Sequence, residues 1–206
     1  MTEIFHKDDF KWSEYYTAIK GSPPRETLIS ALELFDKENI VSEKLLAIDL
    51  GCGSGRDTFE LLKRGWNVFA IDKEQSGIDI IIGALPPEFR NKLTLVVSSF
   101  EKINLPPADL VNASYSLPFC LPEHFDELWM KIENSVLSGG RFSGVFFGLN
   151  DDWSKFSDMT FLEKNKINGM FNNFTIEYFN EKDEDGETST GEKKHWHVYS
   201  VIAKKK

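Results

Sequence analysis

Long hydrophobic segments are missing from this sequence. No apolar run approaches the roughly 20 residues that a helix needs to cross a bilayer. The first residues, among them Glu3, His6 and Lys7, also lack the apolar stretch of a signal peptide. We therefore expect a cytoplasmic protein that does not bind membranes.

Cysteine is scarce, and its two positions, Cys52 and Cys120, match neither a disulfide framework nor a zinc site. His195 and His197 have a spacing that two metal ligands could use, but no third ligand is near them in the sequence. We expect the cysteines to be packing residues in a reducing compartment and the histidines to be ordinary strand residues. No metal site is predicted.

An excess of positive charge is also missing, because 24 Lys and Arg residues stand against 33 Asp and Glu, a formal net charge of −9. This balance opposes approach to a phosphate backbone, so nucleic acid is not expected as a partner. An acidic run from Glu181 to Glu187 is predicted to be a solvated hairpin tip, although it could also meet a basic partner. The sequence leaves open whether the protein is a monomer or a homodimer.

The 206 residues, 41% of them hydrophobic, have the size of one compact domain. Short apolar runs are predicted to be strands, and the first four lack strict alternation, as in parallel strands that are buried on both faces. The predicted strands are five, at residues 45–50, 66–71, 93–97, 108–113 and 142–149. Stripes at helical spacing follow Pro24 and Pro122, the second of them ending at Gly139 and Gly140.

Residues 174–178 and 196–202 alternate in polarity and are predicted to pair as an antiparallel hairpin. The chain should therefore be α/β: a Rossmann-like, doubly wound, mostly parallel seven-stranded sheet with an antiparallel C-terminal hairpin and helices on both faces. We expect one domain over 1–206, with its core at 43–206. Such sheets bind ligands where the strand order reverses, at the carboxyl ends of the strands.

A glycine-rich loop follows the first predicted strand, with Gly51, Gly53 and Gly55 at alternate positions and a helical pattern directly after them. Glycine lets the backbone approach a ligand closely, and the helix amino terminus offers free N–H donors to an anionic group. Asp72 ends the second strand, about 20 residues further on, where an acidic side chain can accept hydrogen bonds from both ribose hydroxyls. The third glycine comes one residue too early for the dinucleotide fingerprint.

The segment from Asp49 to Gly55, together with Asp72, resembles the first two motifs of the class I S-adenosylmethionine-dependent methyltransferases. The motifs span residues 43–113, and the strand order extends the resemblance to the C-terminal hairpin. Within that superfamily, the Gly-Arg-Asp-Thr sequence at the helix start looks most like the tellurite-resistance and thiopurine type of small-molecule methyltransferase.

The resemblance implies S-adenosylmethionine as cofactor and S-adenosylhomocysteine as product. Asp49, Gly51, Gly53 and Gly55 would shape the loop under the methionine portion, and Asp72 would hold the ribose. Further cofactor contacts are implied for a scattered set of residues: Lys73 beside the ribose, Ser99 and Phe100 at the adenine, the Asn112 backbone near the amino group, and Arg25 at the methionine carboxylate.

Residues 1–27 contain Trp12, Tyr15 and Tyr16 and are predicted to close over the cofactor as a lid that completes the acceptor pocket. Tyr15, Tyr16, Tyr115, Asp151 and Trp153 are the candidate acceptor-binding residues. A general base is needed only if the acceptor must lose a proton, and its candidates are Tyr15, Tyr16, His124, Asp151 and Asp152. The Pro-Pro-aromatic motif of adenine and glutamine methyltransferases is absent, which disfavours those substrates.

The function expected from these observations is in-line methyl transfer to a small molecule, where alignment of the reactants supplies much of the rate enhancement. Three alternatives stay open: a protein methyltransferase, a protein that binds S-adenosylmethionine without catalysis, and an enzyme that binds a dinucleotide through the glycine loop instead. The identity of the acceptor does not follow from the sequence.

Overall fold

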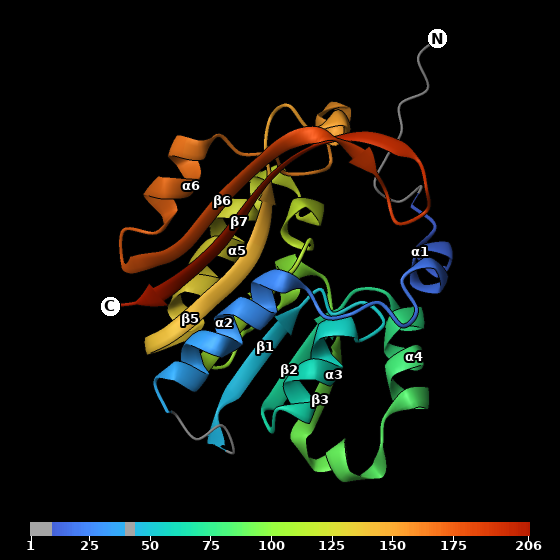
Figure 1. Cartoon of the computed structure of the whole chain (residues 1–206), viewed down its shortest axis with the longest axis vertical. Coiled ribbons are helices and arrows are strands. Elements are labelled where there is room, and N and C mark those ends of the chain that lie inside the picture. Colours follow the sequence, from blue (N-terminus) through green and yellow to red (C-terminus); the bar gives the residue numbers. More distant parts are fainter. Residues whose placement is uncertain (1–9, 40–43) are drawn as a thin grey trace.

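A computed structural model describes residues 10–39 and 44–206. Within these ranges the strands form one seven-stranded sheet in the order β3-β2-β1-β4-β5-β7-β6 (Figure 1). The strands β1 to β5 pair in parallel, and β7 pairs antiparallel with both β5 and β6. The predicted sheet is confirmed. Residues 1–9 of the expected lid and Glu43 of the expected core lie outside the described residues.

The strands begin and end close to the predicted positions at β1 through β4. Their bounds are β1 (Leu46–Leu50), β2 (Asn67–Asp72), β3 (Leu93–Val97), β4 (Ala108–Ala113), β5 (Val136–Phe147), β6 (Phe174–Glu187) and β7 (Lys193–Lys205). The agreement follows from burial, because β1, β2 and β4 are covered on both faces and therefore read as continuous apolar runs.

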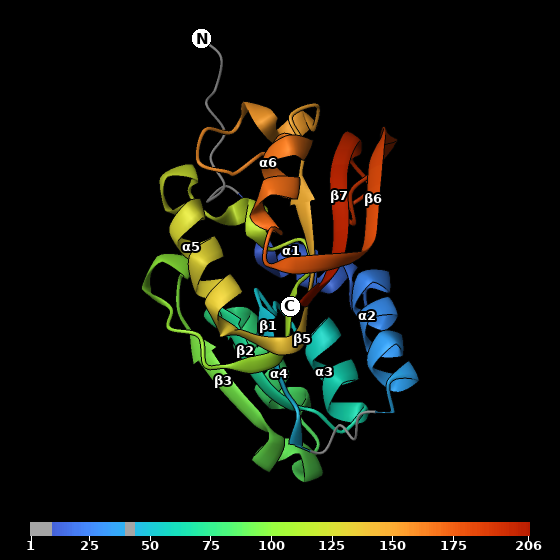
Figure 2. The ribbon, with the colours of Figure 1, turned by 90° about the vertical axis from the view of Figure 1, so that its left-hand side faces the viewer.

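Helices cover both faces of the sheet, as Figure 2 shows with α2 and α3 on one side and α5 and α6 on the other. Their bounds are α1 (Trp12–Ala18), α2 (Glu26–Lys37), α3 (Arg56–Lys63), α4 (Gln75–Ala84), α5 (Pro122–Ser135) and α6 (Lys164–Met170), with short 3-10 turns at 87–92, 100–102, 117–119 and 152–155. The apolar stripe of α2, including Leu28 and Leu32, packs with α3 and α4 on one face, and α5 packs with α6 on the other.

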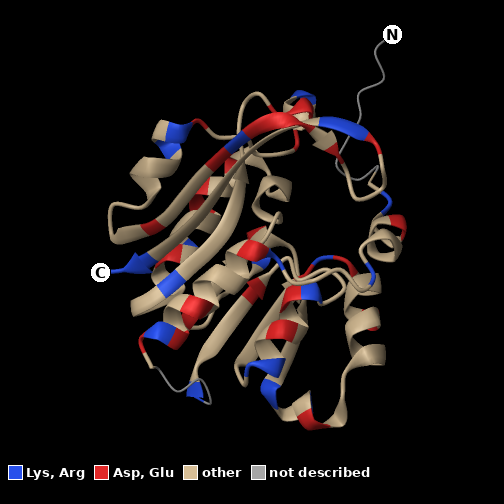
Figure 3. Ribbon diagram, in the orientation of Figure 1, with Lys and Arg blue, Asp and Glu red and all other residues tan. Residues whose placement is uncertain are grey.

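Two expectations about the C-terminal half are wrong. The acidic run from Glu181 to Glu187 is not a hairpin tip, because every residue in it pairs with β7 and the turn lies at residues 188–192 (Figure 3). The fifth strand begins at Val136 rather than residue 142, so the preceding helix ends at Ser135, before the two glycines. Val136 is buried by the same core that covers the helix stripe, which explains why its spacing looked helical.

No helix in the described parts of the chain is long and apolar enough to span a bilayer. The described residues also contain no group of three or more His, Cys, Asp and Glu side chains that could hold a metal ion. His195 instead contacts Asp183 and Asp185 of β6, both at 2.7 Å, as a cross-strand pair. Both cysteines are buried thiols.

Candidate functional site

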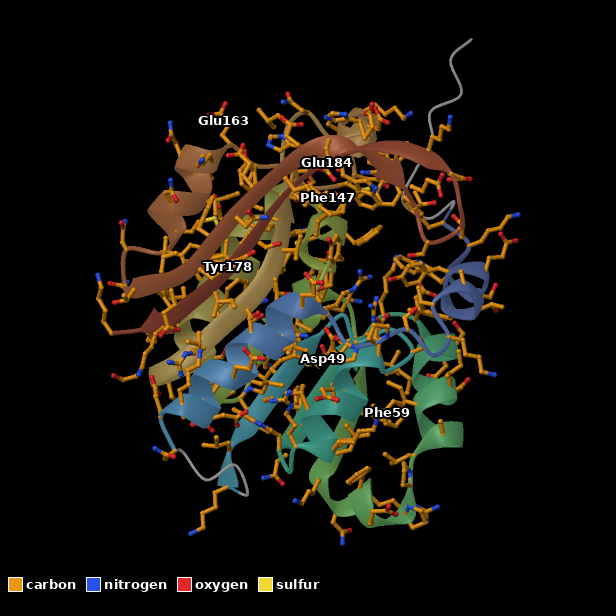
Figure 4. All side chains as sticks on the ribbon, viewed as in Figure 1. Asp49, Phe59, Phe147, Glu163, Tyr178 and Glu184 are labelled. Atoms are coloured by element: carbon orange, nitrogen blue, oxygen red, sulfur yellow. The ribbon has the colours of Figure 1, made fainter. Side chains whose placement is uncertain are left out.

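A cavity opens at the carboxyl ends of β1, β2 and β4, where the strand order reverses between β1 and β4. Asp49 marks this end of β1 in Figure 4. Most of the predicted site residues line the cavity: Tyr15, Tyr16, Arg25, Asp49, Gly51, Gly53, Asp72, Lys73, Ser99, Phe100 and Tyr115. They come from the amino-terminal segment, the glycine loop and the ends of four strands, so the fold brings together positions that are far apart in sequence.

The glycine loop is held tightly against the sheet. The N–H groups of Gly51 and Cys52 both donate to the carbonyl of Ile71, at 2.8 and 2.9 Å, which ties the loop to the end of β2. Gly51 has a φ of +76°, and a Cβ at this position would lie 2.2 Å from the Cβ of Ser116. Only glycine therefore fits where the loop passes the β4 segment, and the loop backbone forms the cavity wall.

Asp72, at the end of β2, lines the cavity and holds the glycine loop. Its carboxylate accepts the N–H of Gly53 at 2.7 Å and the N–H of Glu74 at 2.9 Å. Burial raises the pKa of this carboxyl group, and the two backbone donors oppose that shift. A carboxylate fixed by two N–H donors still has lone pairs for further donors, such as vicinal hydroxyl groups.

A buried polar network lies behind the cavity. Asn112 is the register partner of Asp49, and its amide donates to Asp49 at 3.0 Å and to Asp57 at 3.1 Å. Thr58 donates to Asp49 at 2.6 Å, and Asp57 accepts the backbone N–H of Arg25 at 2.9 Å. Burial, followed by repulsion from Asp57, raises the pKa of Asp49. The network therefore locks β1, β4, α3 and the start of α2 into one rigid unit beneath the cavity.

The helix α1 covers the cavity. Tyr16 is 4% exposed, and its ring and hydroxyl pack against Gly53 and Gly77, where glycine leaves room for them. Burial, together with the charge of Asp72, strongly raises the pKa of Tyr16, so its hydroxyl stays protonated. Trp12 stacks on Tyr16 at 6.2 Å between ring centroids and contacts Phe119 edge-on at 5.0 Å. Aromatic packing therefore holds α1 in place over the loop.

Two arginines, Arg25 before α2 and Arg56 directly after the glycine loop, also line the cavity. The Arg25 guanidinium lies 4.4 Å from the ring centroid of Tyr115 and donates to the hydroxyl of Tyr15 at 3.1 Å. Tyr115 itself has a left-handed backbone with a φ of +59°, an uncommon conformation for a bulky residue. Arg56, the first residue of α3, donates its Nε to the carbonyl of Pro23. These residues combine aromatic surface with positive charge.

Some predicted residues are placed elsewhere. Gly55 is the residue before α3, with a φ of +89°, and packs on Ile81 and Phe59 rather than lining the cavity. Asn112 is fully buried within the polar network. Asp151 is buried in an ion pair with Lys194, and Trp153 packs on Lys194 and Phe119 one layer outside the cavity. His124 and Asp152 do not line the cavity, so Tyr15 and Tyr16 are the base candidates that do.

Sequence reasoning missed several lining residues. Arg56 and Asp57 follow the glycine loop directly, so their proximity could have been inferred from it. Ser116, Phe119 and Glu101 lie on short 3-10 turns or beside them, where no periodic pattern marks them. Their contribution depends on how these turns fold over the strand ends.

Comparison with known proteins adds three findings. Residues 47–140 match the model of a methyltransferase domain family. Over 70 residues the chain is 41% identical to magnesium-protoporphyrin O-methyltransferase from Rhodobacter capsulatus, and this match covers 34% of the chain and 31% of that protein. The chain therefore aligns with less than a third of the length of this relative.

Solved structures share the fold at low sequence identity. TehB from Haemophilus influenzae superposes with a TM-score of 0.76 at 17% identity, covering 95% of this chain and 67% of that one. ChlM, the magnesium protoporphyrin IX methyltransferase of Synechocystis PCC 6803 with bound SAM, gives a TM-score of 0.70 at 12% identity over 96% of this chain and 92% of its own. At these identities the likeness establishes the fold.

Proposed function

We propose that this chain is a class I S-adenosylmethionine-dependent methyltransferase and that it transfers the methyl group of S-adenosylmethionine to a small molecule. The observation that carries this proposal is the cavity at the switch point, where the glycine loop and Asp72 face the covering helix α1. The Rhodobacter capsulatus relative, which is 41% identical over 70 residues, is named magnesium-protoporphyrin O-methyltransferase.

The residues present fit the proposed cofactor. The left-handed glycines at 51 and 53 let the loop backbone pass close to Ser116 and Tyr16, so the backbone itself lines the cavity and the methionine portion could approach it. Asp72 would accept the ribose hydroxyls, with Lys73 beside it, and Ser99 and Phe100 would border the adenine. Arg25 would pair with the methionine carboxylate, because its guanidinium is already oriented by Tyr15 and Tyr115.

When bound, the cofactor supplies a methyl group on a sulfonium. The acceptor atom would bond to the methyl carbon as the carbon–sulfur bond breaks and its electron pair stays on sulfur. An acceptor that binds already ionised would leave no proton to be removed in the covered cavity. The chain contributes positioning: the network beneath Asp49 fixes the loop, and α1 excludes water from the cavity. A dedicated base is not required when the acceptor ionises on its own.

The proposal is tested by a thermal-shift titration with S-adenosylmethionine, S-adenosylhomocysteine and NAD on the wild type, Asp72→Asn and Asp109→Asn. Asp109 is the matched control. Like Asp72, it accepts a backbone N–H, in this case that of Leu46 at 2.9 Å, but it does not line the cavity. A ligand at 100 times its Kd stabilises by about 2.7 kcal/mol, which corresponds to roughly 5–10 °C for a domain of this size.

We expect both adenosyl ligands to raise the midpoint of the wild type and of Asp109→Asn, and to lose most of that effect in Asp72→Asn. A shift with NAD alone would identify a dinucleotide enzyme instead. Methyl transfer only to proteins in a lysate would favour a protein methyltransferase. Tight binding without turnover on any acceptor would favour a non-catalytic binding protein, and no shift with any ligand would contradict the proposal.

A further inference from the structure

The cavity holds two guanidinium groups that have no carboxylate partner within residues 10–39 and 44–206. Arg25 bonds to a neutral hydroxyl and Arg56 to a backbone carbonyl. By contrast, Arg64 contacts Asp36 and Glu60, and Arg141 contacts Glu38 and Glu177. Acidic residues are plentiful in this chain, so the missing partners are a property of the site and not of the composition.

The two charges are close enough to affect each other. Burial, followed by the positive charge of Arg25, lowers the pKa of Arg56, and the negative charge of Asp57 partly opposes this shift. Asp57 bonds the backbone N–H of Arg25 and the Asn112 amide but neither guanidinium group, so a ligand anion could still pair directly with the arginine side chains. The cofactor has one carboxylate, which the proposed function assigns to Arg25. That assignment leaves Arg56 available, with its two terminal nitrogens free among the described contacts to form a bidentate pair.

Aromatic side chains surround these charges in one continuous wall. Trp12 contacts Phe119 and Tyr15, with ring centroids 5.0 and 5.9 Å apart. Tyr15 is bonded to Arg25, and Arg25 lies on the ring of Tyr115. Flat rings offer large contact areas to a flat ligand and favour offset or edge-to-face packing.

The same wall contains an unused hydrogen-bond donor. The Nε1 atom of Trp12 is buried and has no hydrogen-bond partner in the described structure. A buried indole N–H normally finds an acceptor, so a ligand oxygen or nitrogen in the cavity would satisfy it.

From these observations we propose that the methyl acceptor is a planar, aromatic molecule that carries an anionic group, with the anion held by Arg56 and the ring system packed on Trp12, Tyr115 and Phe119. This inference rests on the proposed function, because it requires the cofactor to lie between the glycine loop and Asp72 and to pair its carboxylate with Arg25 and not with Arg56. Arg56 is then a specificity residue for the acceptor and not a cofactor ligand.

The test is isothermal titration of the protein saturated with S-adenosylhomocysteine. The probes are benzoate, 2-naphthoate and 9-anthracenecarboxylate, each paired with its neutral amide, and cyclohexanecarboxylate as a non-planar anion. We expect at least one aryl carboxylate to bind tenfold or more tightly than its amide and than cyclohexanecarboxylate. In Arg56→Gln this preference for the carboxylate should fall below threefold, while the Kd of S-adenosylhomocysteine changes less than threefold.

Two variants make the result specific. Arg90→Gln removes the same charge from an exposed position outside the cavity and should keep the full preference. Arg56→Lys keeps the charge without the planar fork and should retain part of it. Thermal midpoints of all variants, measured without ligand, separate a loss of binding from a loss of folding.

The proposal is overturned if no aryl carboxylate binds better than its amide, or if the preference persists in folded Arg56→Gln. It is also overturned if Arg56→Gln raises the Kd of S-adenosylhomocysteine tenfold and leaves the carboxylate preference intact, because Arg56 would then bind the cofactor. Failure of the wild type to bind S-adenosylhomocysteine at all is a different result, since it removes the proposed function itself.

Discussion

At the scale of single residues, the site depends on glycines that let backbones approach one another. Gly77 lies in α4, and a Cβ there would be 2.6 Å from the carbonyl oxygen of Gly53 and 3.0 Å from the hydroxyl of Tyr16. Gly77→Ala should therefore push α4 away from the cofactor loop. We expect it to lower the thermal midpoint of unfolding. We also expect it to raise the Kd of S-adenosylhomocysteine at least tenfold, as measured by isothermal titration.

Gly83→Ala is the matched control for this substitution, because Gly83 is in the same helix and an added Cβ there meets no atom within 4 Å. Replacing glycine by alanine in a helix gains about 1 kcal/mol of helix propensity, so this variant should be as stable as the wild type or more so. If Gly77→Ala behaved like Gly83→Ala, close packing of α4 on the loop would not matter for the site.

The residues that the sequence marks most clearly, the glycine loop and Asp72, have roles that are local to the chain. The glycine loop and Asp72 can be read from the order strand, loop, helix, strand, because this order fixes where each residue lies. The role of Asn112 could not be read in the same way. Its side chain bridges Asp49 and Asp57, which are 63 and 55 positions away, and this contact exists only once β1 and β4 are neighbours.

At the scale of elements, α1 has little stability of its own. It has only seven residues and no side-chain hydrogen bond at its N-cap, so it depends on the contacts of Trp12 and Tyr16 with the cavity. A ligand beneath it would add contacts to both side chains. We therefore expect amide hydrogen exchange in residues 12–18 to slow at least tenfold when S-adenosylhomocysteine binds.

The helix α5 provides the internal comparison in that experiment, because it packs on the far face of the sheet and should exchange at the same rate with and without ligand. Equal protection of α1 in both states would mean that α1 is a fixed wall. Uniform slowing of α1 and α5 would report global stabilisation and would argue against a separate lid.

Elements that are buried on both faces were predictable from sequence, and those exposed on one face were less so. The central strands match because continuous apolar runs leave few choices. In β6 the acidic residues looked like a turn, yet they are strand residues on the sheet edge, where their side chains reach solvent and pair across to residues such as His195 and Lys164. Charge alone does not distinguish an exposed edge strand from a loop.

At the scale of the whole molecule, one buried arginine joins the two ends of the fold. Arg141 in β5 is fully buried and contacts Glu38 at the end of α2 and Glu177 in β6, at distances from 2.5 to 3.2 Å. Lys204 in β7 also contacts Glu38 at 2.7 Å. The amino-terminal helix that follows the proposed lid is thereby fastened to the C-terminal hairpin.

This cluster predicts a specific dependence of stability on pH. Hydrogen bonds from Arg141 and Lys204 lower the pKa of Glu38 to about 2, from an ordinary value of 4.5. Because the folded state holds the charged form more strongly than the unfolded state does, this stabilisation is complete above the unfolded pKa. It is lost progressively as the pH falls from about 4.5 toward 2.

Glu38→Gln should therefore lower the thermal midpoint clearly at pH 7, where the wild type has the full stabilisation and the variant leaves buried Arg141 with one carboxylate. The difference between the two proteins should shrink steadily below pH 4.5, since the wild-type carboxylate becomes protonated and resembles the amide. Glu33→Gln, on the exposed face of α2, controls for the change in net charge. A midpoint difference that stayed constant from pH 7 to pH 3 would show that the charge of Glu38 does not hold α2 to the hairpin.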